Sequence, residues 1–205
     1  MVRQEKISAQ GQTLTLFIVG ISIIAYSLPR FSDLLVYDRQ AILSGELWRL
    51  LTAPLVHFSA SHIFWDILIF GVAGFAINAS GFRRFWMVCS FAAVIPSLVF
   101  LLTLPELERY GGLSGLATGA VAYFCLCSAF KTKKNRFLWL LILLFMGTKI
   151  IVEATIGTPI FVQTGKVPFR VIPSAHIFGY LGALAAIGWS WPNITLEQTA
   201  RDMRL

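Results

Sequence analysis

The chain has 205 residues, of which 57% are hydrophobic and 13% are charged, whereas about 25% of the residues in a typical soluble domain are charged. This composition excludes an ordinary soluble enzyme and predicts a protein that lies in a membrane. Because each span needs roughly 20 apolar residues, the chain has room for about six spans. We therefore expect a single domain over residues 1–205, without a separate soluble domain.

Apolar runs bounded by polar residues predict an all-α polytopic membrane protein, built as a bundle of transmembrane helices. In chain order, the spans are expected near residues 13–29, 55–79, 84–104, 113–130, 137–156 and 173–191. The first run follows Arg3 and Lys6, and Ala25–Ser27 resembles a signal-peptide cleavage site. We interpret this first run as an uncleaved helix.

The basic residues predict the orientation of the spans, because cytoplasmic loops of membrane proteins carry an excess of Lys and Arg. If the N-terminus is cytoplasmic, ten of the 17 Lys and Arg residues lie on the cytoplasmic side, namely Arg3, Lys6, Arg83, Arg84, Lys131, Lys133, Lys134, Arg136, Arg201 and Arg204. We therefore expect both termini in the cytoplasm, with the lipid bilayer around the apolar surface. The basic residues that set this orientation account for the net charge of +7. We therefore expect no binding of nucleic acid.

This topology places three polar residues at the same depth in the membrane. His62 lies in the outer half of the second span, Ser114 at the start of the fourth and His176 at the start of the sixth, and all three spans run from outside to inside. Intramembrane polar groups are costly and usually mark a functional site. These residues also have a structural interpretation. Ser114 lies next to Gly115 and Gly119, which have the spacing of a helix-packing motif, and a membrane histidine can form a hydrogen bond to a neighbouring helix without a catalytic role.

Three segments of the chain resemble the signature regions of the rhomboid intramembrane serine proteases, in the same order. They are ELWRLLTAPLVHFSASHIFWDILIFGVAG (Glu46–Gly74), GLSG (Gly112–Gly115) and SAHIFGYLGAL (Ser174–Leu184). They are similar, respectively, to the family's Trp-Arg loop with the histidine-rich second span, to its GxSG nucleophile motif and to the histidine of its sixth span. The resemblance implies a rhomboid-like bundle of six helices that cleaves membrane-anchored proteins near the outer face of the membrane.

Within that family, the chain is most similar to the rhombosortase branch. It is compact, and KIIVE (Lys149–Glu153) resembles a Lys-x-x-x-Glu pattern in the fifth span of that branch. The resemblance implies substrates with a C-terminal Gly-Gly sorting tail, cut at the outer, periplasmic side of a bacterial inner membrane. Lys149 and Glu153 either form an ion pair one helical turn apart, shielded from lipid, or bind substrate. Neither is expected to belong to the catalytic pair.

The chemistry follows from the residue types. A serine hydroxyl is a weak nucleophile and needs a base within hydrogen-bond reach, and His176 is the only histidine predicted in a facing helix at the depth of Ser114. We expect Ser114 to attack the scissile carbonyl while His176 takes its proton. The free N–H groups of a helix start, a side-chain donor on His62 and the flexibility of Gly112 and Gly115 would stabilise the oxyanion. This reaction needs no metal and no cofactor.

Asp66 departs from the family, most members of which carry an asparagine four residues after the histidine of the second span. An ionised carboxylate offers only acceptors and would repel the developing oxyanion. Burial could keep Asp66 protonated as a donor. It could instead accept a hydrogen bond from His62, one turn away, and hold that ring in place, which is the alternative we favour.

Residues before the second span are expected to organise a loop. His57 is expected to orient the Trp48–Arg49 segment through a hydrogen bond. Trp48 is typical of an interfacial anchor, and Arg49 of a headgroup contact or a brace inside the loop.

Two other functions are alternatives. A membrane metalloprotein would use His62, Asp66 and His176 as three ligands that activate a water molecule, but it leaves Ser114 without a role. A catalytically inactive rhomboid-like protein would bind membrane spans without cutting them.

Overall fold

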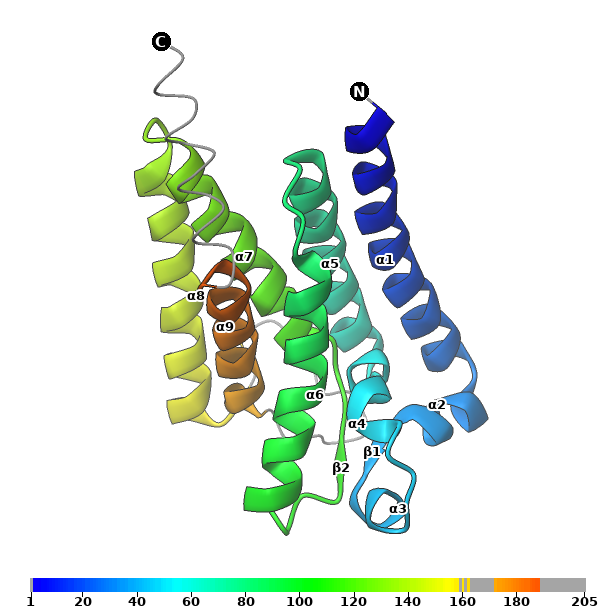
Figure 1. Cartoon of the computed structure of the whole chain (residues 1–205). Helices are drawn as coiled ribbons and strands as arrows, with labels where there is room; N and C mark the ends of the chain where they lie inside the picture. The colour runs from blue at the N-terminus through cyan, green and yellow to red at the C-terminus, as the bar shows by residue number, and fades with distance from the viewer. Residues whose placement is uncertain (1, 159, 161, 163–171, 189–205) are drawn as a thin grey trace.

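The computed structural model describes residues 2–158, 160, 162 and 172–188, with side chains from residue 12 onward. Long helices overlap the predicted spans: α1 (Val2–Ser27), α5 (Ala60–Ala79), α6 (Phe85–Thr103), α7 (Ser114–Lys131), α8 (Arg136–Ile156) and α9 (Pro173–Gly188). Figure 1 shows them alternating in direction along the chain. The end of the predicted sixth span, residues 189–191, lies outside the described residues.

Three of the described helices, α5, α6 and α8, are long and apolar enough to cross a membrane, and Gln12–Ser27 of α1 is a shorter apolar stretch. Large apolar side chains face outward, among them Leu102 at 80% exposure and Phe137 at 79%. Such a surface is costly in water and favourable in lipid. The protein is therefore a helical membrane protein, while the crossing of all six helices stays a prediction.

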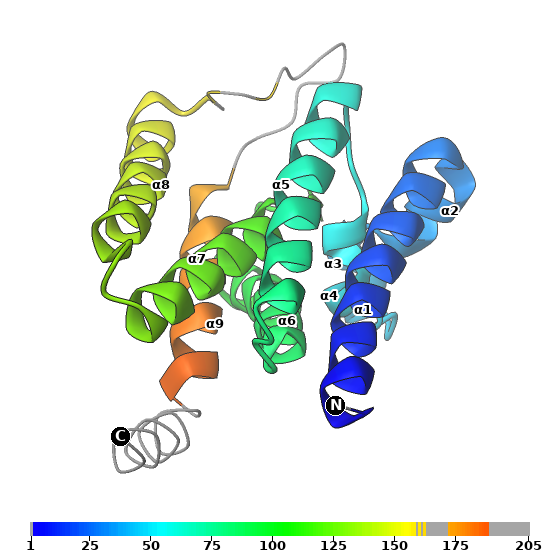
Figure 2. The same cartoon turned by 90° about the horizontal axis from the view of Figure 1, so that it is seen from above.

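Helix α7 occupies the centre of the bundle. Figure 2 shows it with α5 and α8 on opposite sides, and it packs against α5, α6, α8 and α9. The core around it combines small residues such as Ala117 and Ala120 with larger ones such as Leu116 and Phe70. The first residues of α7 are therefore surrounded by the other helices.

The second span begins later than the sequence predicts, at Ala60 instead of near residue 55. Pro54 lies in a short 3-10 helix, η1 (Ala53–Leu55), and the chain is extended at Val56. Ser59 then caps α5, since its hydroxyl accepts a hydrogen bond from the N–H of His62 at 3.1 Å. His57 therefore precedes the helix, so that helical spacing does not determine its position.

The loop between α1 and α5 contains α2 (Pro29–Leu35), β1 (Tyr37–Asp38), α3 (Arg39–Leu43) and α4 (Arg49–Thr52), and Figure 1 shows it at the lower end of the bundle. Arg49 braces it from inside. The guanidinium donates to the carbonyls of Asp33 at 2.6 Å and Val36 at 2.9 Å, and it pairs with Glu46 at 2.7 Å. Of the two roles expected for Arg49, the structure shows the internal brace.

Strand β1 pairs antiparallel with β2 (Arg109–Tyr110), which leads into α7. Tyr37 lies opposite Tyr110, and Asp38 lies opposite Arg109. This short pairing ties the braced loop to the segment that precedes Ser114.

Helices α7 and α9 approach each other closely through glycine. A Cβ atom added at Gly179 would overlap the carbonyl oxygen of Gly115 and lie 2.9 Å from the backbone nitrogen of Gly119. A Cβ atom added at Gly119 would lie 3.0 Å from the carbonyl oxygen of Gly179. Small residues let membrane helices pack backbone against backbone, and this contact sets the spacing of the two helices.

We predict that Gly179→Ala destabilises the protein, because the new methyl group meets backbone atoms that cannot rotate away. Overpacking of this kind costs about 1–3 kcal/mol. Gly147→Ala in α8 is the matched control, because a Cβ atom there meets nothing within 4 Å. Thermal unfolding in detergent measures both variants. Equal unfolding temperatures for the two would contradict the close packing of α7 and α9.

Candidate active site

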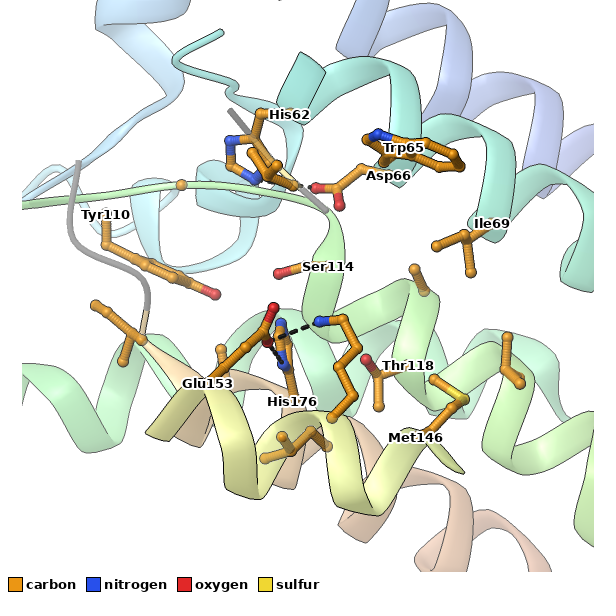
Figure 3. Close-up of a pocket in the computed structure, with 18 of the residues that line it drawn as sticks. His62, Trp65, Asp66, Ile69, Tyr110, Ser114, Thr118, Met146, Glu153 and His176 are labelled. Atoms are coloured by element: carbon orange, nitrogen blue, oxygen red, sulfur yellow. Dashed lines mark hydrogen bonds and ion pairs between the residues drawn. The ribbon is translucent and has the colours of Figure 1, made fainter. Parts of the chain in front are cut away.

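A cavity of about 550 Å³ lies among α5, β2, α7, α8 and α9. Figure 3 shows polar side chains from several elements around it. The polar or charged residues in its lining are His62, Asp66, Arg109, Tyr110, Ser114, Thr118, Lys149, Glu153 and His176. The side chains for which the sequence predicts a role in catalysis, support or substrate binding thus surround one cavity, although they come from four different helices.

Ser114 is the first residue of α7, so it lies where the backbone N–H groups of a helix have no helical carbonyl to bond. Gly112 shapes the approach to it. Its φ of +125° is a conformation that side chains rarely adopt, and a Cβ atom there would lie 2.6 Å from Nε2 of His62. Glycine at this position therefore lets the chain turn into α7 while the His62 ring lies against the backbone.

His176 is buried in the first turns of α9. The helices meet directly beside it, since a Cβ atom added at Gly115 would lie 3.0 Å from the carbonyl oxygen of Ala175. The residue after Ser114 therefore touches the residue before His176. Figure 3 shows the Ser114 hydroxyl pointing into the cavity between His176 on one side and Asp66 with His62 on the other.

Lys149 and Glu153 form an ion pair at 2.7 Å on α8, with the Glu153 side chain only 2% exposed. The same carboxylate oxygen, Oε2, lies 3.7 Å from Nδ1 of His176. The spacing of four residues predicts the pair, but the sequence contains no signal for the contact with His176. That contact depends on how α8 packs against α9.

Asp66 lies between two imidazole rings. Its Oδ2 atom is 3.2 Å from Nε2 of His57 and 3.2 Å from Nε2 of His62. The expected role of His57 in orienting the Trp48–Arg49 segment is wrong, because the recorded partners of its Nε2 atom are Asp66 and the backbone N–H of Leu113 at 3.3 Å. His57 reaches Asp66 from the segment that precedes α5.

The protons in this cluster can be arranged in two ways, because one ring nitrogen either donates or accepts. If Asp66 is ionised, both rings donate to it. If Asp66 is protonated, its O–H can donate to Nε2 of His57, in competition with the N–H of Leu113 for the single lone pair of that nitrogen. The geometry accommodates both alternatives that the sequence raises for Asp66.

The three metal ligands predicted for a metalloprotein do not come together. Among the described residues, the group whose ligand atoms lie within 4.8 Å of one another is His57, His62 and Asp66. His176 faces Glu153 instead. The predicted set of His62, Asp66 and His176 is therefore corrected, and hydrogen bonds to Asp66 account for the group that does form.

Tyr110 is a cavity residue that the sequence does not reveal. Its ring packs at 6.3 Å from Tyr37 and at 5.1 Å from Phe100, and its hydroxyl points toward the cavity in Figure 3. A tyrosine phenol is protonated at neutral pH, and burial raises the pKa of Tyr110 further, so its hydroxyl is a hydrogen-bond donor. Its position depends on the β1–β2 pairing, for which two residues per strand leave no periodic pattern.

Comparison with known proteins identifies a related family. A family model described as Rhomboid domain matches residues 44–192. The match covers α4 to α9, and with them the cavity and all three segments that carry the resemblance. A search of curated proteins finds no match for the chain.

We predict that Gly112→Ala destabilises the protein more than a change in backbone preference alone can explain. The methyl group would be strained at positive φ and would also collide with His62. Gly45→Ala is the matched control, since Gly45 has a φ of +108° but open space around it. We expect an additional loss of about 1–3 kcal/mol for Gly112→Ala in thermal unfolding. Similar losses in both variants would show that His62 does not lie against Gly112.

Proposed function

Because the chain belongs to the rhomboid family, we propose that it is an intramembrane serine endopeptidase in which Ser114 is the nucleophile and His176 its general base. One observation carries the assignment. Ser114 and His176 face the same cavity from α7 and α9, and the backbones of these helices touch at Gly115 and Ala175. A nucleophile and its base must be held in a fixed relation, and this contact provides it.

The proposed reaction has two steps. Ser114 Oγ forms a bond to the scissile carbonyl carbon, and His176 takes the hydroxyl proton and passes it to the leaving amine as the C–N bond breaks. Water then attacks the carbonyl carbon of the acyl-enzyme while His176 accepts its proton, and His176 returns this proton to Ser114 Oγ as the ester C–O bond breaks and the carboxylate product leaves. If an amine replaces water in the second step, the product is a new amide and the reaction is a transpeptidation.

The oxyanion would be held by the N–H groups of the first turn of α7, near the positive end of its dipole, and by His62. Asp66 supports His62 in our proposal as an ionised acceptor shared with His57, and because Nε2 of His62 then donates to Asp66, the oxyanion would be bonded by a proton on Nδ1 of the same ring. The common distance of 3.2 Å from one carboxylate oxygen to both rings supports this choice. Gly112 allows the ring to approach the backbone that precedes Ser114.

The substrates are proposed to be transmembrane or C-terminally tail-anchored proteins, in particular those with Gly-Gly sorting tails. The rest of the cavity supports an apolar substrate segment, because Trp65 and Ile69 of α5 line it together with Ile142, Phe145 and Met146 of α8. The resemblance of Lys149–Glu153 to the rhombosortase pattern supports the narrower assignment. Lys149 and Glu153 border this cavity, where they can also meet substrate.

We propose that the protein lies in a bacterial inner membrane, with both termini cytoplasmic and the cavity open to the periplasm. The positions of the basic residues support this orientation. Lys131 at the end of α7 donates to the carbonyl of Ser80 beyond α5, so the basic loop after α7 and the basic loop after α5 are neighbours. They lie at the opposite end of the bundle from the braced loop.

We predict that Ser114→Ala and His176→Ala each reduce cleavage of a co-expressed tail-bearing substrate by about 10³-fold or more, because the reaction loses its nucleophile or its base. Ser114→Ala should also abolish labelling by a fluorophosphonate probe. Ser128→Ala, a serine change in the same helix away from the cavity, should retain both. Chelators should have no effect. Cleavage by Ser114→Ala, or a chelator effect reversed by zinc, would contradict the serine mechanism, and absence of labelling in the parent would favour an inactive binding protein.

We predict that Asp66→Asn lowers activity by about tenfold or more at every pH, because an amide that turns its N–H toward His62 reverses the hydrogen bond that holds the ring. His62→Ala should then cost about as much as Asp66→Ala. A profile of cleavage rate against pH measures the effect. Activity that is retained in Asp66→Asn and extends to higher pH would instead show that Asp66 acts as a protonated donor.

A further inference from the structure

We propose that Glu153 is a positioning residue for His176, so that the proposed Ser114–His176 pair works as a triad with a carboxylate supplied by α8. The proposal rests on the proposed serine protease function and gives Glu153 a role in its chemistry beyond contact with substrate. Glu153 would accept a hydrogen bond from Nδ1 of His176. The other ring nitrogen, Nε2, would then carry the lone pair that takes the proton of Ser114.

The geometry around His176 supports this role. Glu153 Oε2 lies 3.7 Å from Nδ1, and the two side chains are 2% and 7% exposed. Nδ1 is buried and has no hydrogen-bond partner among the described residues. A buried N–H without a partner is costly, and Glu153 is the acceptor beside it. Catalytic hydrogen bonds are often long before substrate binds and shorten in the complex, so this separation suits the unliganded site.

The Glu153 carboxylate is itself fixed in place. Lys149 Nζ lies 2.7 Å from Oε2, and the backbone N–H of Ile160 donates to Oε1 at 3.0 Å. Helix α8 ends at Ile156, and the next residue, Gly157, has a φ of +76° that turns the chain back and brings Ile160 to the carboxylate. With both oxygens held, Oε2 still has a second lone pair, and this lone pair is available to His176.

Glu153 and Lys149 have opposite effects on the protonated form of His176. The negative charge of Glu153 stabilises the imidazolium that forms when His176 takes the proton, and the positive charge of Lys149 opposes it. Among the described residues, the other titratable groups that act on His176 are His62 and Asp66 of α5. A variant of Glu153 and a variant of Lys149 leave those two groups unchanged, so the two variants should shift the pH dependence of the reaction in opposite directions.

The test is the rate at which a fluorophosphonate probe labels Ser114 in purified detergent-solubilised protein, measured against pH. Glu153→Gln should slow labelling by about 10- to 100-fold, because the amide can hold either tautomer of the ring. In the profile of labelling rate against pH, the acidic limb is the range in which labelling slows as His176 becomes protonated. For Glu153→Gln this limb should move to lower pH, since the imidazolium loses its stabilising charge. Lys149→Met should move that limb to higher pH. Glu106→Gln, a change at an exposed glutamate, should match the parent.

Folding is controlled for by a second variant, because Glu153→Gln leaves Lys149 without its counter-charge. The double variant Lys149→Met with Glu153→Gln removes both charges, and it should fold and still label more slowly than the Lys149→Met variant. Glu153→Asp, which keeps the carboxylate, should restore part of the rate and the parental position of the limb. A structural ion pair alone would lower the unfolding temperature without moving the limb.

The outcomes separate the two proposals. If the parent labels at Ser114, and the folded Glu153→Gln and double variants label at the rates of their controls with an unmoved limb, the triad is overturned and the serine protease assignment stands. If the parent does not label at Ser114 at all, the proposed function fails, and the triad fails with it. Slower labelling with opposite shifts of the limb in the two single variants supports the triad.

Discussion

The close contact of α7 with α9 is the constraint on which the site depends. Three glycines, Gly115, Gly119 and Gly179, bring the two backbones to a separation that a methyl group would prevent. In a membrane, the hydrophobic effect does not drive helices together, so backbone packing of this kind has to supply the attraction. The contact lies one residue from Ser114 and three residues from His176. Packing and chemistry are therefore coupled in this protein, because a change in helix spacing is also a change in the geometry of the proposed catalytic pair.

Two polar clusters lie on either side of Ser114, and in each of them a buried carboxylate is stabilised by its partners. His57, His62 and Asp66 form one, and Lys149, Glu153 and His176 form the other. A carboxylate in a low-dielectric interior is costly unless it has partners, and both carboxylates have more than one. Each cluster also leaves an imidazole at the cavity, His62 beside the backbone before Ser114 and His176 on the neighbouring helix α9. His62 and His176, which help to stabilise the two buried carboxylates, are thus also the imidazoles that the proposed chemistry needs.

The loop before α5 connects this interior to one end of the bundle. Arg49 holds the loop together by donating to the carbonyls of Asp33 and Val36, and β1 of this loop pairs with β2. Tyr110 and the turn at Gly112 follow immediately, and α7 begins at Ser114. The position of Ser114, the proposed nucleophile, therefore depends on two features. They are the loop that Arg49 braces, which is paired with the segment before α7, and the glycine contact between α7 and α9.

Much of this protein follows from local patterns in the sequence. Apolar runs indicate the helices, and the ends of α6 and α8 lie within about one residue of the predicted spans because polar residues bound them sharply. The motifs indicate the rhomboid family, and helical spacing relates Lys149 to Glu153 and His62 to Asp66. These features depend on residues close together in the chain. The tertiary structure alone decided that His57 joins Asp66, that Tyr110 lines the cavity, and that Glu153 faces His176. Each of these contacts joins segments whose relative position depends on how the helices pack and where the chain turns between them, and periodicity carries no information about either.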